Sequence, residues 1–191
     1  KSFEPDMVSE IKKHINSKSP KSGEPYVGVI HRLDKPVQGV MVYAKNQKSA
    51  AALSAALQAG KMEKSYMAVI CGQLVDKQGS YVDYLRQDRK NNTSEIVDKS
   101  VKDAKKAVLK YREMEVIHSP EDKEQMVSLI DIELLTGRHH QIRVQFAGHG
   151  TPLYGDGRYG GDISTIVDIK KKPAARGPLA LCAYHLAFPH P

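Results

Sequence analysis

The sequence has only two cysteines and no tryptophan. Cys71 and Cys182 lie far apart and form no Cys-x-x-Cys pair. This spacing excludes a zinc-finger framework and a disulfide scaffold, and it favours a reducing, cytoplasmic setting. No apolar run approaches the roughly 18 residues that a membrane-spanning helix needs. The sequence therefore predicts a cytoplasmic protein that has no membrane as a partner.

The chain also has fewer acidic than basic residues. The chain has 29 Lys and Arg against 22 Asp and Glu, which gives a net charge of +7. Such an excess favours a polyanionic partner, most simply a nucleic acid. The charge-dense segment 99–112 is compatible with a phosphate-binding surface and equally with a strand edge protected by lysines. Charge alone leaves nucleic-acid binding and simple solubility open.

The length of 191 residues predicts one domain, in which residues 1–25 form an N-terminal helix and loop. The charged fraction of 27% and the hydrophobic fraction of 40% are typical of a folded domain. The chain starts at Lys1 rather than Met. We therefore expect the full-length protein to carry further residues upstream.

Hydrophobic patterning predicts a mixed α+β fold, because strands come in runs with few helices between them. Asp6 is the expected N-cap of a first helix, and Asn46 is the expected N-cap of a second helix that ends near Gly60. A third helix is expected over 139–147. The predicted strands cover 26–30, 40–43, 66–71, 81–85, 107–117, 126–135 and 179–188.

The segment His31-Arg32-Leu33-Asp34 is the first candidate for chemistry, because it places an acid, a guanidinium and an imidazole in a turn between two predicted strands. Its aspartate could act as a nucleophile or a general base, and its arginine could bind phosphate. The alternative is an ordinary turn in which the aspartate caps the backbone. The segment by itself leaves both interpretations open.

The segment Thr136-Gly137-Arg138-His139-His140-Gln141 opens the third predicted helix and offers N–H groups and cations to an anion. Arg138 and Arg143 could hold phosphates or pair with a carboxylate. Adjacent histidines on a helix point in different directions, so we expect no metal site here and assign the histidines to hydrogen bonding. Tyr66 is either a packed core residue or a ring that stacks on a base. Asp156 is interpreted as a loop residue first.

Three blocks together resemble the RluA-type RNA pseudouridine synthases: HRLDKPVQGVMVYAKN, KSYMAVICG and LLTGRHHQIRVQFAGHGTPLYGDGRYG. The closing CAYHLAFPHP is similar to the last strand of this family. The resemblance covers residues 27–191. It implies a mixed, mostly antiparallel central sheet with flanking helices and loops, and an RNA cleft across the sheet.

The resemblance also implies roles for individual residues. Asp34 matches the catalytic aspartate, Tyr66 the tyrosine that packs against the target base, and Arg143 the basic residue that pairs with the aspartate. Arg32 matches an arginine that fills the space left by the flipped nucleotide. The other residues expected to contact RNA are His31, Arg138, His140 and Gln141.

The implied reaction converts specific uridines of ribosomal or transfer RNA into pseudouridine. It breaks the N1–C1′ bond, rotates the uracil and joins C5 to C1′, so we expect neither a cofactor nor a metal, and no obligatory protein partner. A stacked uridine must first be flipped out, at a cost of a few kcal/mol.

The sequence also departs from the family pattern. Val37-Gln38-Gly39 stands where Thr-Ser-Gly is frequent, His139 replaces a Thr or Ser, and Gln145 replaces a His. A noncatalytic RNA-binding module is therefore the main alternative. A metal-dependent phosphodiesterase lacks the carboxylate clusters that it would need.

Overall fold

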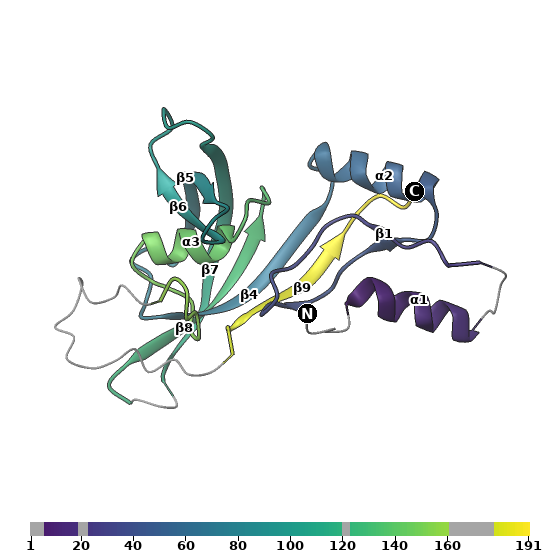
Figure 1. The fold of residues 1–191 in the computed structure, drawn as a ribbon. Helices are drawn as coiled ribbons and strands as arrows, with labels where there is room; N and C mark the ends of the chain where they lie inside the picture. The colour runs from purple at the N-terminus through teal and green to yellow at the C-terminus, as the bar shows by residue number, and fades with distance from the viewer. Residues whose placement is uncertain (1–5, 19–22, 120–122, 161–177) are drawn as a thin grey trace. The chain divides into compact units, whose positions relative to one another are not determined.

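The computed structural model describes residues 6–18, 23–119, 123–160 and 178–191 (Figure 1). The chain forms two compact units. The first comprises residues 1–33, 40–62 and 187–191, and the second comprises residues 34–39 and 63–186. The sequence predicts a Gly/Lys/Pro-rich loop over 160–178, and residues 161–177 of it lie outside the described part of the chain.

The first unit contains the helices α1 (Met7–Lys18) and α2 (Gln47–Gln58) and a small antiparallel pair of strands, β1 (Gly28–Val29) and β3 (Tyr43–Ala44). Both predicted N-caps are confirmed. Asp6 accepts hydrogen bonds from the backbone N–H and the hydroxyl of Ser9. Asn46 Oδ1 accepts the N–H of Ser49 at 2.8 Å. Each cap satisfies a backbone donor that the first helical turn leaves unpaired.

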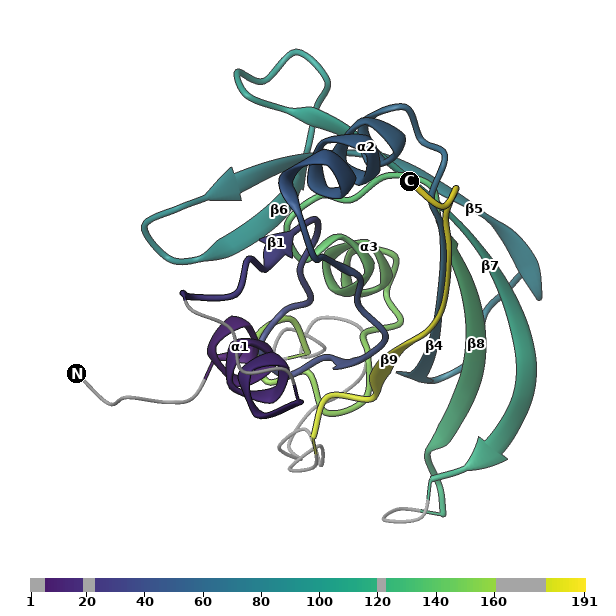
Figure 2. The same cartoon turned by 90° about the vertical axis from the view of Figure 1, so that its right-hand side faces the viewer.

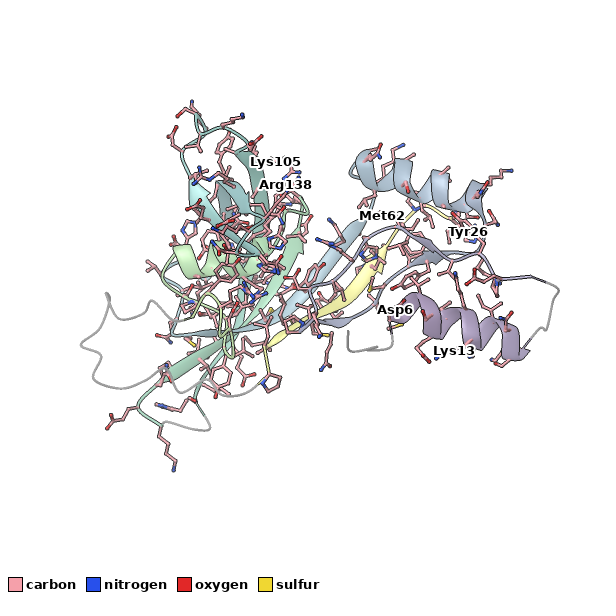
Figure 3. The ribbon with its side chains drawn as sticks, in the orientation of Figure 1. Asp6, Lys13, Tyr26, Met62, Lys105 and Arg138 are labelled. Carbon is pink, nitrogen blue, oxygen red and sulfur yellow. The ribbon has the colours of Figure 1, made fainter. Side chains whose placement is uncertain are left out.

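A small hydrophobic core holds the first unit together. Leu53 from α2 packs with Ala44 of β3 and with Met62, a residue labelled in Figure 3. Phe188, from the end of the chain, packs against the same cluster. The alanine-rich helix is therefore a packing element, as its sequence predicts.

The second unit is built on a seven-stranded sheet with the order β2-β9-β4-β8-β7-β5-β6. The pairs β4–β8, β8–β7, β7–β5 and β5–β6 are antiparallel, whereas β2 pairs with β9 in parallel. This arrangement confirms the expected mixed, mostly antiparallel sheet. The strands are β2 (Gln38–Gly39), β4 (Glu63–Cys71), β5 (Gln78–Asp88), β6 (Thr93–Val97), β7 (Lys105–His118), β8 (Met126–Leu134) and β9 (Leu181–Ala187).

Helix α3 (Gln141–Gly148) lies within the curve of β4, β8 and β7 (Figure 2). Its residues from Gln141 to Phe146 are all buried. Phe146 is fully buried and makes an edge contact with the ring of Tyr81 on β5, with the ring centroids 5.2 Å apart. A helix buried on all sides places its polar side chains among core residues, where each needs a partner.

Two strands differ from the sequence prediction. The sequence predicts a strand over 81–85 that ends at a polar stretch, 86–92. In the structure β5 continues to Asp88, and the chain returns as β6, a strand that the sequence does not predict. Strand β2 was also missed. Its two residues are held by pairing with Cys182 and Ala183 of β9, a contact between segments far apart in the chain.

Candidate active site

Asp34 lies at the start of the tight turn that leads into β2. Its carbonyl accepts the N–H of Val37 at 2.8 Å, and Gly39 then packs directly against Ala183 of β9. Gly39 has a φ of +138° and no room for a Cβ atom, so only glycine fits here. The pairing with β9 therefore anchors the turn, and the Asp34 side chain is left 26% exposed.

Arg143 extends from α3 toward Asp34. Its Nη1 atom lies 3.5 Å from Asp34 Oδ2, and its side chain is only 7% exposed. On its other side, Nε and Nη2 each donate a hydrogen bond of 2.8 Å to Asp156. Burial by itself would lower the pKa of Arg143, but the hydrogen bonds and negative charge of Asp156 raise it. The predicted pairing of Arg143 with Asp34 is thus present as an ion pair.

Asp156 is the residue that the sequence analysis missed. Its side chain has no exposed surface. Besides Arg143, its Oδ1 atom accepts the backbone N–H groups of Arg158 and Tyr159. Burial raises the pKa of Asp156, but hydrogen bonds from Arg143 and these N–H groups outweigh it and leave the pKa below its ordinary value. A turn-forming aspartate was visible in the sequence, but its arginine partner was not.

His140 is the second neighbour of Asp34, with Nε2 placed 3.6 Å from Asp34 Oδ2. Its φ of 52° and ψ of 26° lie in the left-handed region, which is uncommon for a residue other than glycine. Such backbone conformations cost free energy and occur often at functional sites. The strained residue therefore brings its imidazole to the carboxylate immediately before α3 begins.

A short hydrogen-bond chain supports His140. Tyr159 Oη accepts the N–H of Ser94 at 2.9 Å and lies 2.7 Å from His140 Nδ1. When the phenol donates to Nδ1, the ring proton of a neutral His140 is on Nε2, facing Asp34.

We expect the stability of the protein to depend on pH through His140. Burial lowers its pKa to about 4, although the charge of Asp34 opposes this effect. Below the ordinary pKa of 6.5, the unfolded chain takes up a proton that folded His140 does not. Stability should thus fall from pH 6.5 toward 4, by up to about 1.4 kcal/mol per unit. Urea unfolding at each pH measures this slope, which His140→Gln should reduce; an equal slope in both proteins would contradict the assignment.

Tyr66 lies on β4 and is 8% exposed. Burial, with a smaller contribution from the negative charge of Asp34, raises the pKa of Tyr66 to about 12. The phenol therefore stays protonated at neutral pH. Its electrostatic interaction with Asp34 places it in the same site.

The remaining predicted residues have different surroundings. Arg138 is exposed, and its Nε donates to the carbonyl of Lys106 at 2.9 Å. Gln141 is buried, and its side chain bonds to Thr136, to the N–H of Arg138 and to Gln145. In the first unit, His31 Nε2 accepts the N–H of Val42, and Arg32 is exposed.

The departures from the family pattern have structural partners. Gln145 is fully buried, and its amide donates to Asp83 at 2.7 Å while its oxygen accepts from Gln141. His139 stacks on His140 with ring centroids 3.7 Å apart and bonds to Ser94. Both residues thus support the turn and α3 through internal hydrogen bonds.

In the described part of the chain, no group of three or more His, Cys, Asp or Glu side chains is arranged to hold a metal ion. His139 and His140 form hydrogen bonds to Ser94 and Tyr159, respectively. The same residues contain no helix that is long and apolar enough to cross a membrane.

Residues 5–148 match the family model described as RNA pseudouridylate synthase. The chain belongs to this family. The match runs from the first helix through Asp34, Tyr66 and Arg143 to the end of α3. It confirms the resemblance that the three sequence blocks indicate.

Individual relatives agree with this membership. An uncharacterized RNA pseudouridine synthase of Aquifex aeolicus is 35% identical over 190 residues, which cover 97% of this chain and 56% of the relative. A ribosomal large subunit pseudouridine synthase D of Xanthomonas campestris is 35% identical over 139 residues, covering 73% of this chain and 39% of the relative. The chain thus spans about half the length of the curated relatives it matches.

A solved structure supports the fold. Human RNA pseudouridylate synthase domain containing 1 superposes with a TM-score of 0.74 at 22% identity, over 94% of this chain and 69% of the human one. The mixed sheet described above is therefore the pseudouridine synthase fold.

Proposed function

We propose that this chain isomerises specific uridines of RNA to pseudouridine, with Asp34 as the catalytic carboxylate. The observation that carries the proposal is the placement of Asp34 within 3.5 Å of the buried Arg143, in a chain of the RNA pseudouridylate synthase family. The reaction transfers no electrons and no external group, so it needs no cofactor. We propose that residues 1–191 act as one catalytic domain, because the family match over residues 5–148 includes parts of both units.

Asp34 and Tyr66 have different roles at the flipped nucleotide. The partly exposed Asp34 carboxylate is accessible to the sugar and base, while Arg143 and His140 hold it from the protein side. Tyr66 stacks on the uracil and remains a hydrogen-bond donor, because its pKa of about 12 keeps the phenol protonated. Because Tyr66 is protonated in the resting protein, a group other than a Tyr66 phenolate accepts the proton that uracil loses from C5.

RNA contacts come from both units. Arg32, which is exposed, fills the space of the flipped base and offsets part of the unstacking cost. Arg138 contacts phosphate, and His31 also contacts RNA. Gln141 and His140 are buried and have supporting roles. Gln141 holds the turn before α3, and His140 holds the carboxylate of Asp34.

The substrate that we propose is ribosomal RNA, and the compartment is the cytoplasm. A relative that is 35% identical to this chain is named for the large ribosomal subunit. The net charge of +7 suits a polyanionic substrate. Transfer RNA is the second substrate class to be tested.

Tritium release from RNA labelled at uridine C5 tests the function, because isomerisation must expel that hydrogen. Unmodified large and small ribosomal RNA transcripts and a transfer RNA pool are incubated with the chain. Release from a ribosomal transcript is expected. Release from transfer RNA alone would overturn the substrate class, and RNA binding without release would favour the noncatalytic RNA-binding module.

A further inference from the structure

Lys64 lies on the same face of β4 as Tyr66, because successive side chains of a strand alternate between its two sides. Tyr66 and Ala68 on this face are buried. Lys64 is two positions before Tyr66, which corresponds to roughly 7 Å along the strand. Lys64 thus belongs to the side of the sheet that carries the candidate active site.

The positive charge of Lys64 has no counter-ion in the described part of the chain. Its side chain is half-buried, and no hydrogen bond or ion pair joins it to another described residue. Burial, followed by the positive charge of nearby Arg138, lowers the pKa of Lys64. Three other strand cations have acidic partners: Lys110 with Glu133, Arg112 with Asp131 and Arg86 with Glu95. Lys105 and Lys106 have none among the described residues but are exposed to solvent. A desolvated and unpaired ammonium destabilises the free protein unless an anion binds to it.

Arg138 completes a cluster of cations at this end of the sheet. Its Nε donates to the carbonyl of Lys106, which holds the guanidinium in place. Its Nη1 and Nη2 atoms make no hydrogen bond within the described residues. Figure 3 labels Arg138 next to Lys105, the first residue of β7. The two free guanidinium nitrogens suit an oxyanion with two acceptor oxygens.

Gly137 leaves open space between the two cations. A Cβ atom built on Gly137 would meet Lys64 Nζ at 3.6 Å and no other described atom within 4 Å, its chain neighbours aside. Lys64 therefore reaches the turn that carries Arg138, and Gly137 in this turn is exposed.

We propose that Lys64, Arg138 and the open backbone at Gly137 form a subsite for a phosphate group of the RNA strand, next to the nucleotide that stacks on Tyr66. This subsite deepens the proposed function and rests on it. Binding of a phosphate would neutralise the positive charges of Lys64 and Arg138, which have no acidic partner among the described residues of the free protein.

The test measures binding of a fluorescein-labelled oligouridylate strand to the chain by anisotropy, over a series of potassium chloride concentrations. Lys64→Met keeps the apolar stem and removes the charge. It should weaken binding roughly tenfold at low salt and reduce the slope of log K against log salt by about 0.7–1. Lys64→Arg should restore the slope. Lys77→Gln is the matched control, because this exposed lysine follows the opposite end of β4.

A second measurement separates binding from a structural role. Lys64→Met should unfold at the same or a higher urea concentration than the parent, because it removes an unpaired charge. A lysine that only supports the fold would give a lower midpoint. The subsite is wrong if Lys64→Met keeps the parental salt slope, whatever the tritium assay shows. A different outcome separates the two proposals. If Lys64→Met reduces the salt slope but the parent chain releases no tritium, the phosphate subsite is supported and the proposed isomerase activity is wrong.

Discussion

Asp34→Asn is expected to abolish tritium release from C5-labelled RNA while the protein stays folded. Asparagine keeps the size of the side chain but removes the carboxylate that acts on the nucleotide. Loss of a positioned acid or base typically costs about 10²–10⁴-fold in rate, and a loss of at least this size is expected. The rate of tritium release at saturating RNA measures the effect.

The fold should tolerate this substitution. Asp34 is 26% exposed, and its contacts to Arg143 and His140 are 3.5 and 3.6 Å long. Arg143 keeps both hydrogen bonds to Asp156, so we expect stability to change by less than about 1 kcal/mol. Asp76→Asn, at an exposed position, is the matched control. Release at a near-parental rate by Asp34→Asn would show that another group performs the chemistry.

Asp156→Asn is expected to destabilise the protein by about 3–5 kcal/mol, because it leaves the guanidinium of Arg143 buried without its main partner. The asparagine NH₂ group also faces the N–H donors of Arg143, where the carboxylate accepts two hydrogen bonds. Urea unfolding measures the loss as a change in midpoint at constant slope. Activity of the folded fraction should fall too, since Arg143 would no longer be held toward Asp34.

A double-mutant cycle distinguishes this ion pair from general packing. Arg143→Met together with Asp156→Leu removes both charges, so the pair should lose less stability than the sum of the two single changes. Strictly additive losses would contradict the role assigned to the pair. The parent should also lose stability as pH falls below 3.8, the ordinary pKa of an aspartate, because the pKa of Asp156 is lowered in the folded state. Asp156→Asn should show a smaller loss over this pH range than the parent.

Local patterns in the sequence were sufficient for much of the fold. The caps Asp6 and Asn46 satisfy backbone donors within three residues of themselves, so their helices begin where the sequence predicts. The strands around Tyr66 and Ile130 are marked by their own apolar residues. The family and the residues Asp34, Tyr66 and Arg143 followed from linear motifs. Their catalytic roles stay predictions until the substitutions are measured.

The roles of Asp156, His140 and Lys64 were decided by tertiary structure. Asp156 is an ordinary turn residue in the sequence until α3 brings Arg143 to it, and His140 has its hydrogen-bond partner Tyr159 19 residues further along. Lys64 stands out only because burial removes its solvent and the turn of Gly137 brings Arg138 near. The sequence by itself determined which side chains are present and which local elements form. Burial and charge pairing depend on residues far apart in the chain, and the folded sheet alone sets those distances.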